Sequence, residues 1–125
     1  MTEYALGNVF IRPFRLEGAG DVMAGHTHNF DHVTYVVRGS VHARCWRRIL
    51  DADGSPMVSA TGEEMWFLFA ERDVLAGDLV PIRAEDKHGF TALEPRTLCH
   101  CIYSHRDPQS HEVIQDHNGW IDAYV

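Results

Sequence analysis

The sequence has no long apolar run and no excess of positive charge. No stretch approaches the roughly 18 apolar residues that a membrane-spanning helix needs, and the segment that begins at Met1 lacks the basic and apolar regions of a secretory signal. Lys and Arg number 11 against 18 Asp and Glu, and the formal net charge of −7 disfavours binding to a phosphate backbone. We therefore expect a cytoplasmic protein that binds neither membranes nor nucleic acid.

Cysteine is scarce and is not arranged in pairs. The three cysteines, Cys45, Cys99 and Cys101, include no C-x-x-C motif of the kind that binds zinc or exchanges disulfides. We expect them to be free thiols in a reducing compartment, either buried or on the surface of a strand.

Long stripes of helical period are also missing. Short runs rich in Val, Ile, Tyr, Phe and Trp recur instead between Gly, Asp, Asn and Pro residues, which predicts a mostly β protein. The apolar run Trp66-Phe67-Leu68-Phe69 is typical of a strand that is buried on both faces. The expected strands are Val9 to Phe14, Met23 to His28, His32 to Arg38, His42 to Ile49, Met65 to Phe69, Leu79 to Ile82, Gly89 to Leu93 and Arg96 to Tyr103.

The chain suits one domain. Its 125 residues match the size of a single hydrophobic core, and no linker or repeat interrupts the series of strands. Many short antiparallel strands would expose unpaired backbone groups at the sheet edges, and a closed barrel or a double-sheet jelly roll leaves few such edges. We therefore predict an all-β jelly roll over residues 1–125. The tail, residues 104–125, contains a possible edge strand at 112–115 and is expected to cap the barrel or to contact another subunit.

Histidine is abundant, and four of the nine histidines suggest a metal site. His26 and His28 are two residues apart, so their side chains point to the same side of an extended backbone. His32 lies four positions further on, either on the same face or at the head of a second strand after a turn. His88 begins another expected strand. Neutral imidazole is a common ligand for Zn, Fe, Ni and Cu.

The spacing around these histidines resembles the two motifs of the cupin family. Residues 20–39 resemble the first motif, with Gly20, His26-x-His28, His32 and the closing Gly39 at the family's distances. Residues 77–93 resemble the second motif, with a glycine-aspartate start and the terminal His88. The resemblance implies a small cupin-type β-barrel, usually a homodimer, with a metal ion held inside by His26, His28 and His88.

Two departures from the cupin pattern affect the expected site. His32 stands where the family has a glutamate ligand, which makes it the fourth metal-ligand candidate in an all-histidine site. Arg83 and Glu85 stand where the family has Pro and Gly, which weakens the turn expected before His88.

Four neutral ligands leave a divalent ion with a net charge near +2 and favour the divalent state. The expected ion is Fe, Mn, Ni, Cu or Zn. With six coordination positions, four histidines leave two positions open for substrate or for substrate and dioxygen. If the ion is tetrahedral zinc, four histidines fill all of its coordination positions and the site is structural.

Strand alternation predicts the residues that line a substrate pocket. Thr34 and Val36 share the face of His32, and Phe90 shares the face of His88. On the strand from Arg96 to Tyr103, either His100 and its neighbours Leu98 and Ile102, or the opposite set that includes both cysteines, faces inward. We expect His100 to face inward and to join Thr34, Val36 and Phe90 in the pocket.

The predicted function is a metal-dependent oxygenase that acts on a small organic molecule. This activity is implied by analogy with all-histidine cupins, and the sequence assigns no catalytic acid or base. One alternative is a non-catalytic module that binds a small molecule or a metal. Another is a lyase, isomerase or cyclase that uses the metal purely as a Lewis acid.

Overall fold

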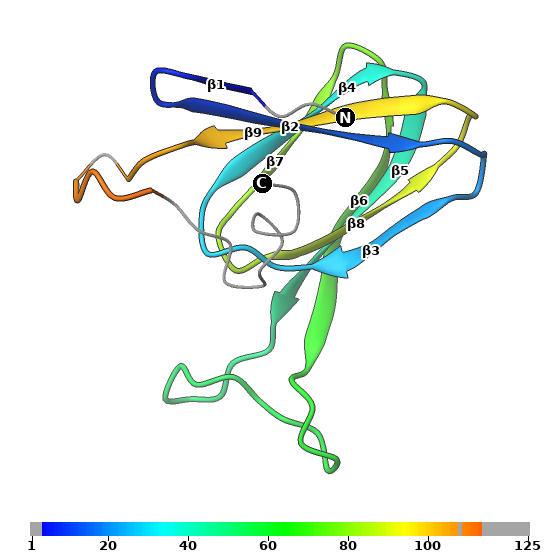
Figure 1. Cartoon of the computed structure of the whole chain (residues 1–125). Coiled ribbons are helices and arrows are strands. Elements are labelled where there is room, and N and C mark those ends of the chain that lie inside the picture. Colours follow the sequence, from blue (N-terminus) through cyan, green and yellow to red (C-terminus); the bar gives the residue numbers. More distant parts are fainter. Residues whose placement is uncertain (1–3, 108, 114–125) are drawn as a thin grey trace.

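The computed structural model describes residues 4–107 and 109–113, and all of the strands in this part of the chain belong to two antiparallel sheets. The five-stranded sheet has the order β1-β2-β9-β4-β7, and the four-stranded sheet has the order β3-β8-β5-β6 (Figure 1). The strand bounds are β1 Tyr4–Leu6, β2 Val9–Leu16, β3 Val22–His26, β4 His32–Arg38, β5 Ser40–Arg48, β6 Trp66–Leu75, β7 Leu79–Ile82, β8 Lys87–Ala92 and β9 Thr97–Ser104. This architecture confirms the predicted all-β jelly roll.

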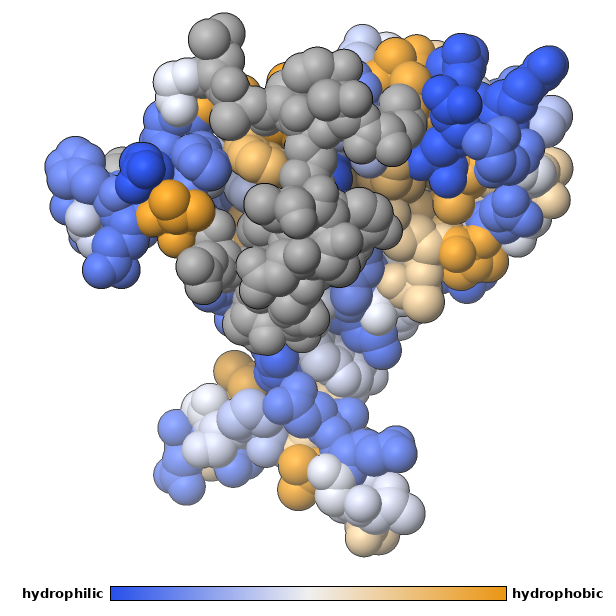
Figure 2. All heavy atoms as spheres, in the orientation of Figure 1, coloured by the Kyte–Doolittle hydropathy of each residue, from blue (hydrophilic) through white to orange (hydrophobic). Residues whose placement is uncertain are grey.

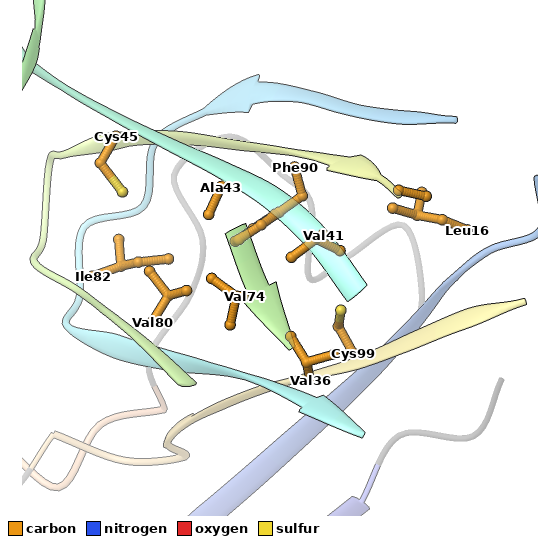
Figure 3. Close-up of a cluster of buried hydrophobic side chains, with 11 residues drawn as sticks. Leu16, Val36, Val41, Ala43, Cys45, Val74, Val80, Ile82, Phe90 and Cys99 are labelled. Atoms are coloured by element: carbon orange, nitrogen blue, oxygen red, sulfur yellow. The ribbon is translucent and has the colours of Figure 1, made fainter. Parts of the chain in front are cut away.

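The hydrophobic core lies between the inner faces of the two sheets. Val36 and Cys99 from the five-stranded sheet meet Val41 and Phe90 from the four-stranded sheet in one buried cluster (Figure 3). Alternation along β4 explains this arrangement, since every second residue from His32 to Val36 is buried. All three cysteines are buried and free, as the sequence analysis predicts.

Arg72 links the edge strands of the two sheets, β6 and β7, by hydrogen bonds. The guanidinium of Arg72 on β6 donates from Nη2 to the carbonyl of Leu79 on β7 at 2.7 Å, and from Nη1 to the Asp78 carboxylate at 3.2 Å. These bonds tie β6 to β7 and join the two sheets at this side of the barrel.

The prediction that Trp66 to Phe69 form a strand buried on both faces is wrong. Phe67 and Leu68 are 45% and 44% exposed. The physical reason is that β6 is an edge strand, and its first residues lie at the base of an arm, residues 49–65, which extends away from the two sheets (Figure 1). Figure 2 shows that this arm is mostly hydrophilic, with isolated apolar residues.

The tail lies mostly outside the described residues. Val113 forms an isolated bridge with Arg106, and residues 114 and 115 of the expected edge strand at 112–115 lie outside the described residues. No helix in the described part of the chain has the length and apolar character that crossing a membrane requires.

Candidate metal centre

Four histidines from three strands and one loop come together inside the barrel. His26 ends β3, His28 follows it in the loop to β4, His32 begins β4, and His88 lies on β8 directly opposite His26 in the strand register. The His28 and His88 side chains are 2% and 1% exposed. The centroid of the His88 ring lies 4.3, 5.0 and 4.8 Å from those of His26, His28 and His32.

Three of the four histidines form the tighter group. One ring nitrogen from each of His26, His28 and His88 lies within 4.8 Å of the other two, a spacing that suits shared ligation of one ion. His32 packs its ring against His28 at 5.0 Å and against His88 at 4.8 Å, outside that group. The structure therefore places His32 beside the group as a neighbour of two of its members.

Backbone carbonyls fix which ring nitrogen carries the proton in His26 and His88. The Nδ1 of His26 lies 2.9 Å from the carbonyl oxygen of Ala24, and the Nδ1 of His88 lies 3.1 Å from that of Asp86. A carbonyl only accepts, so each Nδ1 donates and each Nε2 keeps its lone pair for a ligand. The Nε2 of His88 is buried and has no hydrogen-bond partner within the described residues.

The environment keeps His88 neutral. Burial lowers the pKa of His88 well below its ordinary value, and the neighbouring His26 and His32 lower it further. A neutral ring is the form that binds a metal. A group of imidazoles whose nitrogens lie close together, with His88 neutral and buried among them, fits a divalent transition metal ion.

Gly89 lets the strands that carry His26 and His88 approach closely. A Cβ added at Gly89 of β8 would lie 3.2 Å from the backbone nitrogen of Gly25 and from the carbonyl oxygen of Met23 on β3. A side chain at Gly89 would therefore press the two strands apart and shift the two imidazoles.

The turn before His88 forms despite its unusual sequence. Glu85 adopts a left-handed backbone with φ of 69°, in a region where glycine is the usual residue. Its amide donates to the carbonyl of His28 at 2.7 Å, and Arg48 donates to both its carbonyl and its carboxylate, at 3.2 and 3.1 Å. These bonds hold the turn in place of the missing glycine and attach it to the loop that carries His28.

Comparison with known proteins supports the fold. No family model matches the sequence, and no curated protein matches it. A solved cupin superfamily protein from Desulfitobacterium hafniense aligns with a TM-score of 0.54 at 14% identity, over 82% of this chain and 73% of the other. The chain has the cupin fold.

Two further solved structures share this fold. KdgF from Halomonas sp. aligns with a TM-score of 0.56 at 21% identity, over 80% of this chain and 72% of that protein. Hydroquinone 1,2-dioxygenase PnpCD, solved with Cd²⁺ and 4-hydroxybenzonitrile, aligns with a TM-score of 0.57 at 16% identity, over 83% of this chain and 62% of its own. At these identities the likeness shows the cupin fold alone.

Three of the four predicted pocket residues lie on the inner face of this cupin barrel. Thr34, Val36 and Phe90 are buried there. The expectation that His100 faces inward is wrong. Cys99 and Cys101 are the buried residues of β9, so His100 lies on the opposite, outer face, half-buried between Pro13 and Tyr35 of the flanking strands.

A pocket opens at the end of the five-stranded sheet, where β4 begins and β9 ends. Its volume is about 510 Å³, and its lining includes Val33, Pro81 and Ile102 as well as His32 and Tyr103. The pocket thus reaches one of the four clustered histidines.

Arg12 is a buried charged residue of the barrel interior that was not predicted. Its side chain is 1% exposed. The available signal was its position on an apolar strand. Arg12 lies two residues from both Phe10 and Phe14, so the three side chains share one face of the strand.

Proposed function

We propose that this cupin binds one divalent transition metal ion through His26, His28 and His88, with His32 as a fourth ligand, and that it oxygenates a small organic molecule. The observation that carries the proposal is the grouping of three imidazoles whose nitrogens lie within 4.8 Å of one another. The hydroquinone dioxygenase of the same fold, solved with Cd²⁺, supports both parts of it.

The residues around the proposed ion have two roles, to orient the ligand nitrogens and to enclose the substrate. His26 and His88, held by the carbonyls of Ala24 and Asp86, present Nε2 in a fixed direction. Thr34, Val36 and Phe90 face the same interior and limit the access of water to a bound substrate. When bound, the ion supplies Lewis acidity and, for Fe, Mn, Ni or Cu, a change of oxidation state.

The experiment is elemental analysis of protein purified without added metal, followed by oxygen-electrode measurements with diketones, thiols and phenols. We expect about one Fe, Mn, Ni or Cu ion per chain and oxygen uptake with one of these classes. A chain that contains a redox-active metal and consumes no oxygen with any of them contradicts the oxygenase and leaves metal binding intact.

A second candidate is a zinc protein without redox chemistry. The observation that favours it is the fourth ring, since His32 lies 4.8 Å from His88 and four imidazoles complete a tetrahedral zinc shell. Stoichiometric zinc with no oxygen uptake supports a Lewis-acid or structural role. A chain purified without any metal supports the non-catalytic binding module.

We also propose that the protein is a homodimer. The outer face of the five-stranded sheet exposes apolar side chains, among them Val9, Val37 and Leu79, at 48%, 38% and 43%. Multi-angle light scattering of the full chain is expected to give twice the 14.2 kDa monomer mass. The monomer mass at micromolar concentration contradicts the dimer.

A further inference from the structure

The arm that projects from the barrel concentrates exposed apolar surface at its base. Half of the large apolar side chains that are exposed in the described part of the chain lie between residues 50 and 69. Phe67, Leu68 and Phe69 are consecutive at the base of the arm, where β6 begins. A two-stranded hairpin on its own is marginally stable in water, and concentrated apolar exposure is typical of an interaction site.

The far end of the arm is acidic. The arm forks into two turns, each closed by a backbone hydrogen bond (Figure 1). It contains four carboxylates and no lysine or arginine. Glu64 pairs with Arg48 at 2.7 Å, whereas the exposed Asp53 and Glu63, one at each turn, lie farther out. The arm thus changes from an apolar base to a negatively charged end.

The outer face of the five-stranded sheet begins with an apolar pocket. Ile102 of β9 is paired with Ile11 of β2 and with Val33 of β4, and Val33 is paired with Pro81 of β7. These residues alternate with buried residues of their strands and therefore face outward. Val9, Val33, Pro81 and Ile102 line the pocket of about 510 Å³, which has room for aromatic side chains.

The opposite end of this outer face is positively charged. Leu98, four residues before Ile102 on β9, is paired with Arg15 of β2 and Arg38 of β4. Arg15 contacts Glu17 at 3.6 Å, and Arg38 donates to a backbone carbonyl at 3.1 Å. The described strands β2, β4, β7 and β9 contain no carboxylate. The outer face thus changes from apolar to positive, the complement of the arm.

The two surfaces also match in length. Phe67 and Glu63 are four residues apart on the arm, as Ile102 and Leu98 are on β9, and four residues of extended chain span ~13 Å. The arm leaves the other, four-stranded sheet and extends away from both sheets (Figure 1). It therefore does not lie on the outer face of its own chain, and a second copy offers the same face.

Two such contacts bury enough surface for a stable dimer. A large side chain has roughly 150–200 Å² of surface, so the seven exposed apolar residues between 50 and 69 present roughly 500–600 Å². One side of the arm supplies about half of this area and covers an equal area of the partner. A two-fold axis doubles the contact to ~1,000–1,200 Å², the size at which specific interfaces begin.

We propose that the arm of each chain packs across the outer face of the five-stranded sheet of a second copy of this chain. The apolar base lies at the pocket, and the acidic turns lie at Arg15 and Arg38. The inference rests on the proposed homodimer and names its two contacting surfaces. The contact is isologous, since each chain gives one arm and receives one, and the opposite charges set the direction of the arm.

The first test measures the dimer Kd of the full chain and of three variants by sedimentation equilibrium. Phe67→Glu alters the arm and Val9→Glu alters the pocket. Val22→Glu is the matched control, because Val22 is 63% exposed on β3, outside both surfaces. Phe67→Glu and Val9→Glu are expected to raise the Kd at least about tenfold, since each places a charge in an apolar contact, and Val22→Glu is expected to leave it unchanged.

The second test reverses the charges. Arg15→Glu with Arg38→Glu is expected to raise the dimer Kd at least about tenfold, and so is Asp53→Lys with Glu63→Lys. The chain with all four substitutions has the natural net charge and restores the attraction, so its Kd is expected to return to within about threefold of the natural value. A fourfold variant as weak as either pair overturns the inference. This test does not depend on the folding of Phe67→Glu, because all four positions are exposed.

The outcomes separate the inference from the homodimer. A natural chain that is monomeric at micromolar concentration contradicts both. A dimer whose Kd is the same in Phe67→Glu, Val9→Glu and Val22→Glu overturns the inference alone, and the homodimer then forms through another surface. A weaker dimer in Phe67→Glu with an unchanged one in Val9→Glu overturns the outer face as the partner of the arm.

Discussion

A histidine serves as a metal ligand only when its other nitrogen is held and its ring stays neutral. His88 meets both conditions, because Asp86 accepts from its Nδ1 at 3.1 Å and burial lowers its pKa. His100, of the same chemistry, lies half-buried on the outer face of β9 away from the cluster. The two residues differ in their surroundings, and this difference can be tested directly.

His28→Ala is expected to reduce the bound metal to about a tenth or less of that in the natural chain, because it removes one of three grouped ligands. His100→Ala is the matched control and is expected to keep full metal content. The measurement is elemental analysis of both variants, with circular dichroism to verify β-sheet content. Equal metal in the two variants contradicts the assigned ligands.

A second histidine sits between two carboxylates on the outer face of the four-stranded sheet. His42 lies 2.7 Å from Asp73 through Nδ1 and 2.9 Å from Glu71 through Nε2. The hydrogen bonds to Asp73 and then Glu71 raise the pKa of His42 above its ordinary 6.5. The hydrogen bond to His42 is the main cause that lowers the pKa of Glu71 below its ordinary 4.5.

The signs of these shifts define a pH window. The raised pKa of His42 stabilises the fold fully below pH 6.5, and this stabilisation is lost as the pH rises through the folded-state pKa. The lowered pKa of Glu71 stabilises the fold above pH 4.5, and this stabilisation is lost as the pH falls. His42→Gln is expected to lower Tm by a few degrees at most between these values, because the groups are largely solvated.

The readout is the difference in Tm between the natural chain and His42→Gln, measured by differential scanning fluorimetry across pH. This difference is expected to shrink as the pH rises through the raised folded-state pKa of His42, because the ring then loses its proton in both states. His100→Gln serves as the control. A difference that grows with pH contradicts the assignment.

At the scale of elements, strand alternation predicts an inner face only where the two faces differ in polarity. β4 alternates clearly, and its inward residues Thr34 and Val36 were predicted. The two faces of β9 are similarly apolar, so the sequence could not decide the direction of His100. Arg12 was missed because an arginine on a strand is usually exposed, although it shares the face of Phe10 and Phe14 and is buried in the structure.

Elements at the edge of a sheet are the other source of error. The apolar run at the start of β6 suggested burial, yet nothing in the run itself shows that β6 is an edge strand or that an arm begins there. The meeting of the two histidine-bearing segments was predicted, because their spacing resembles a family pattern that brings His26, His28 and His88 together, and the structure groups these three residues.

Gly39 and Gly77 stand at such turns and differ in their surroundings. Both have left-handed backbones, with φ of 81° and 91°. A Cβ at Gly39 would collide with Thr97, whose Cα would be 2.9 Å away, whereas a Cβ at Gly77 would meet nothing within 4 Å.

Gly39→Ala is therefore expected to lower the free energy of unfolding by about 2–4 kcal/mol, from backbone strain plus the collision. Gly77→Ala is expected to cost about 1–2 kcal/mol from backbone strain alone. Urea denaturation of both variants measures the two values. Equal losses would show that the contact with Thr97 relaxes without cost.

At the scale of the whole molecule, the net charge of −7 contrasts with the group of His26, His28 and His88, which contains no carboxylate. A divalent ion held by these imidazoles would keep its positive charge. A small anion is therefore expected to meet attraction at the metal-loaded site and repulsion at the surface, and its affinity for the loaded site is expected to depend on ionic strength.

The hydrophobic core and the histidine cluster have no residue in common. We therefore expect the fold to persist when the metal ion is removed. The main cluster of 11 buried apolar residues spans both sheets and contains none of the four histidines (Figure 3). A chain treated with a chelator is therefore expected to stay folded, with its β-sheet spectrum intact. Zn²⁺ at about 100 times its Kd then stabilises the native state by ~2.7 kcal/mol, which raises Tm by about 10 °C.

His28→Ala supplies the control for this last measurement, since Zn²⁺ is expected to leave its Tm nearly unchanged. Differential scanning calorimetry of both proteins, with and without Zn²⁺, gives the two shifts. Unfolding of the natural chain on chelation would mean that the ion binds during folding and stabilises the barrel itself, because a binding site that exists only with the ion contributes its binding energy to the fold. The same Zn²⁺-dependent shift in both proteins would place the ion elsewhere.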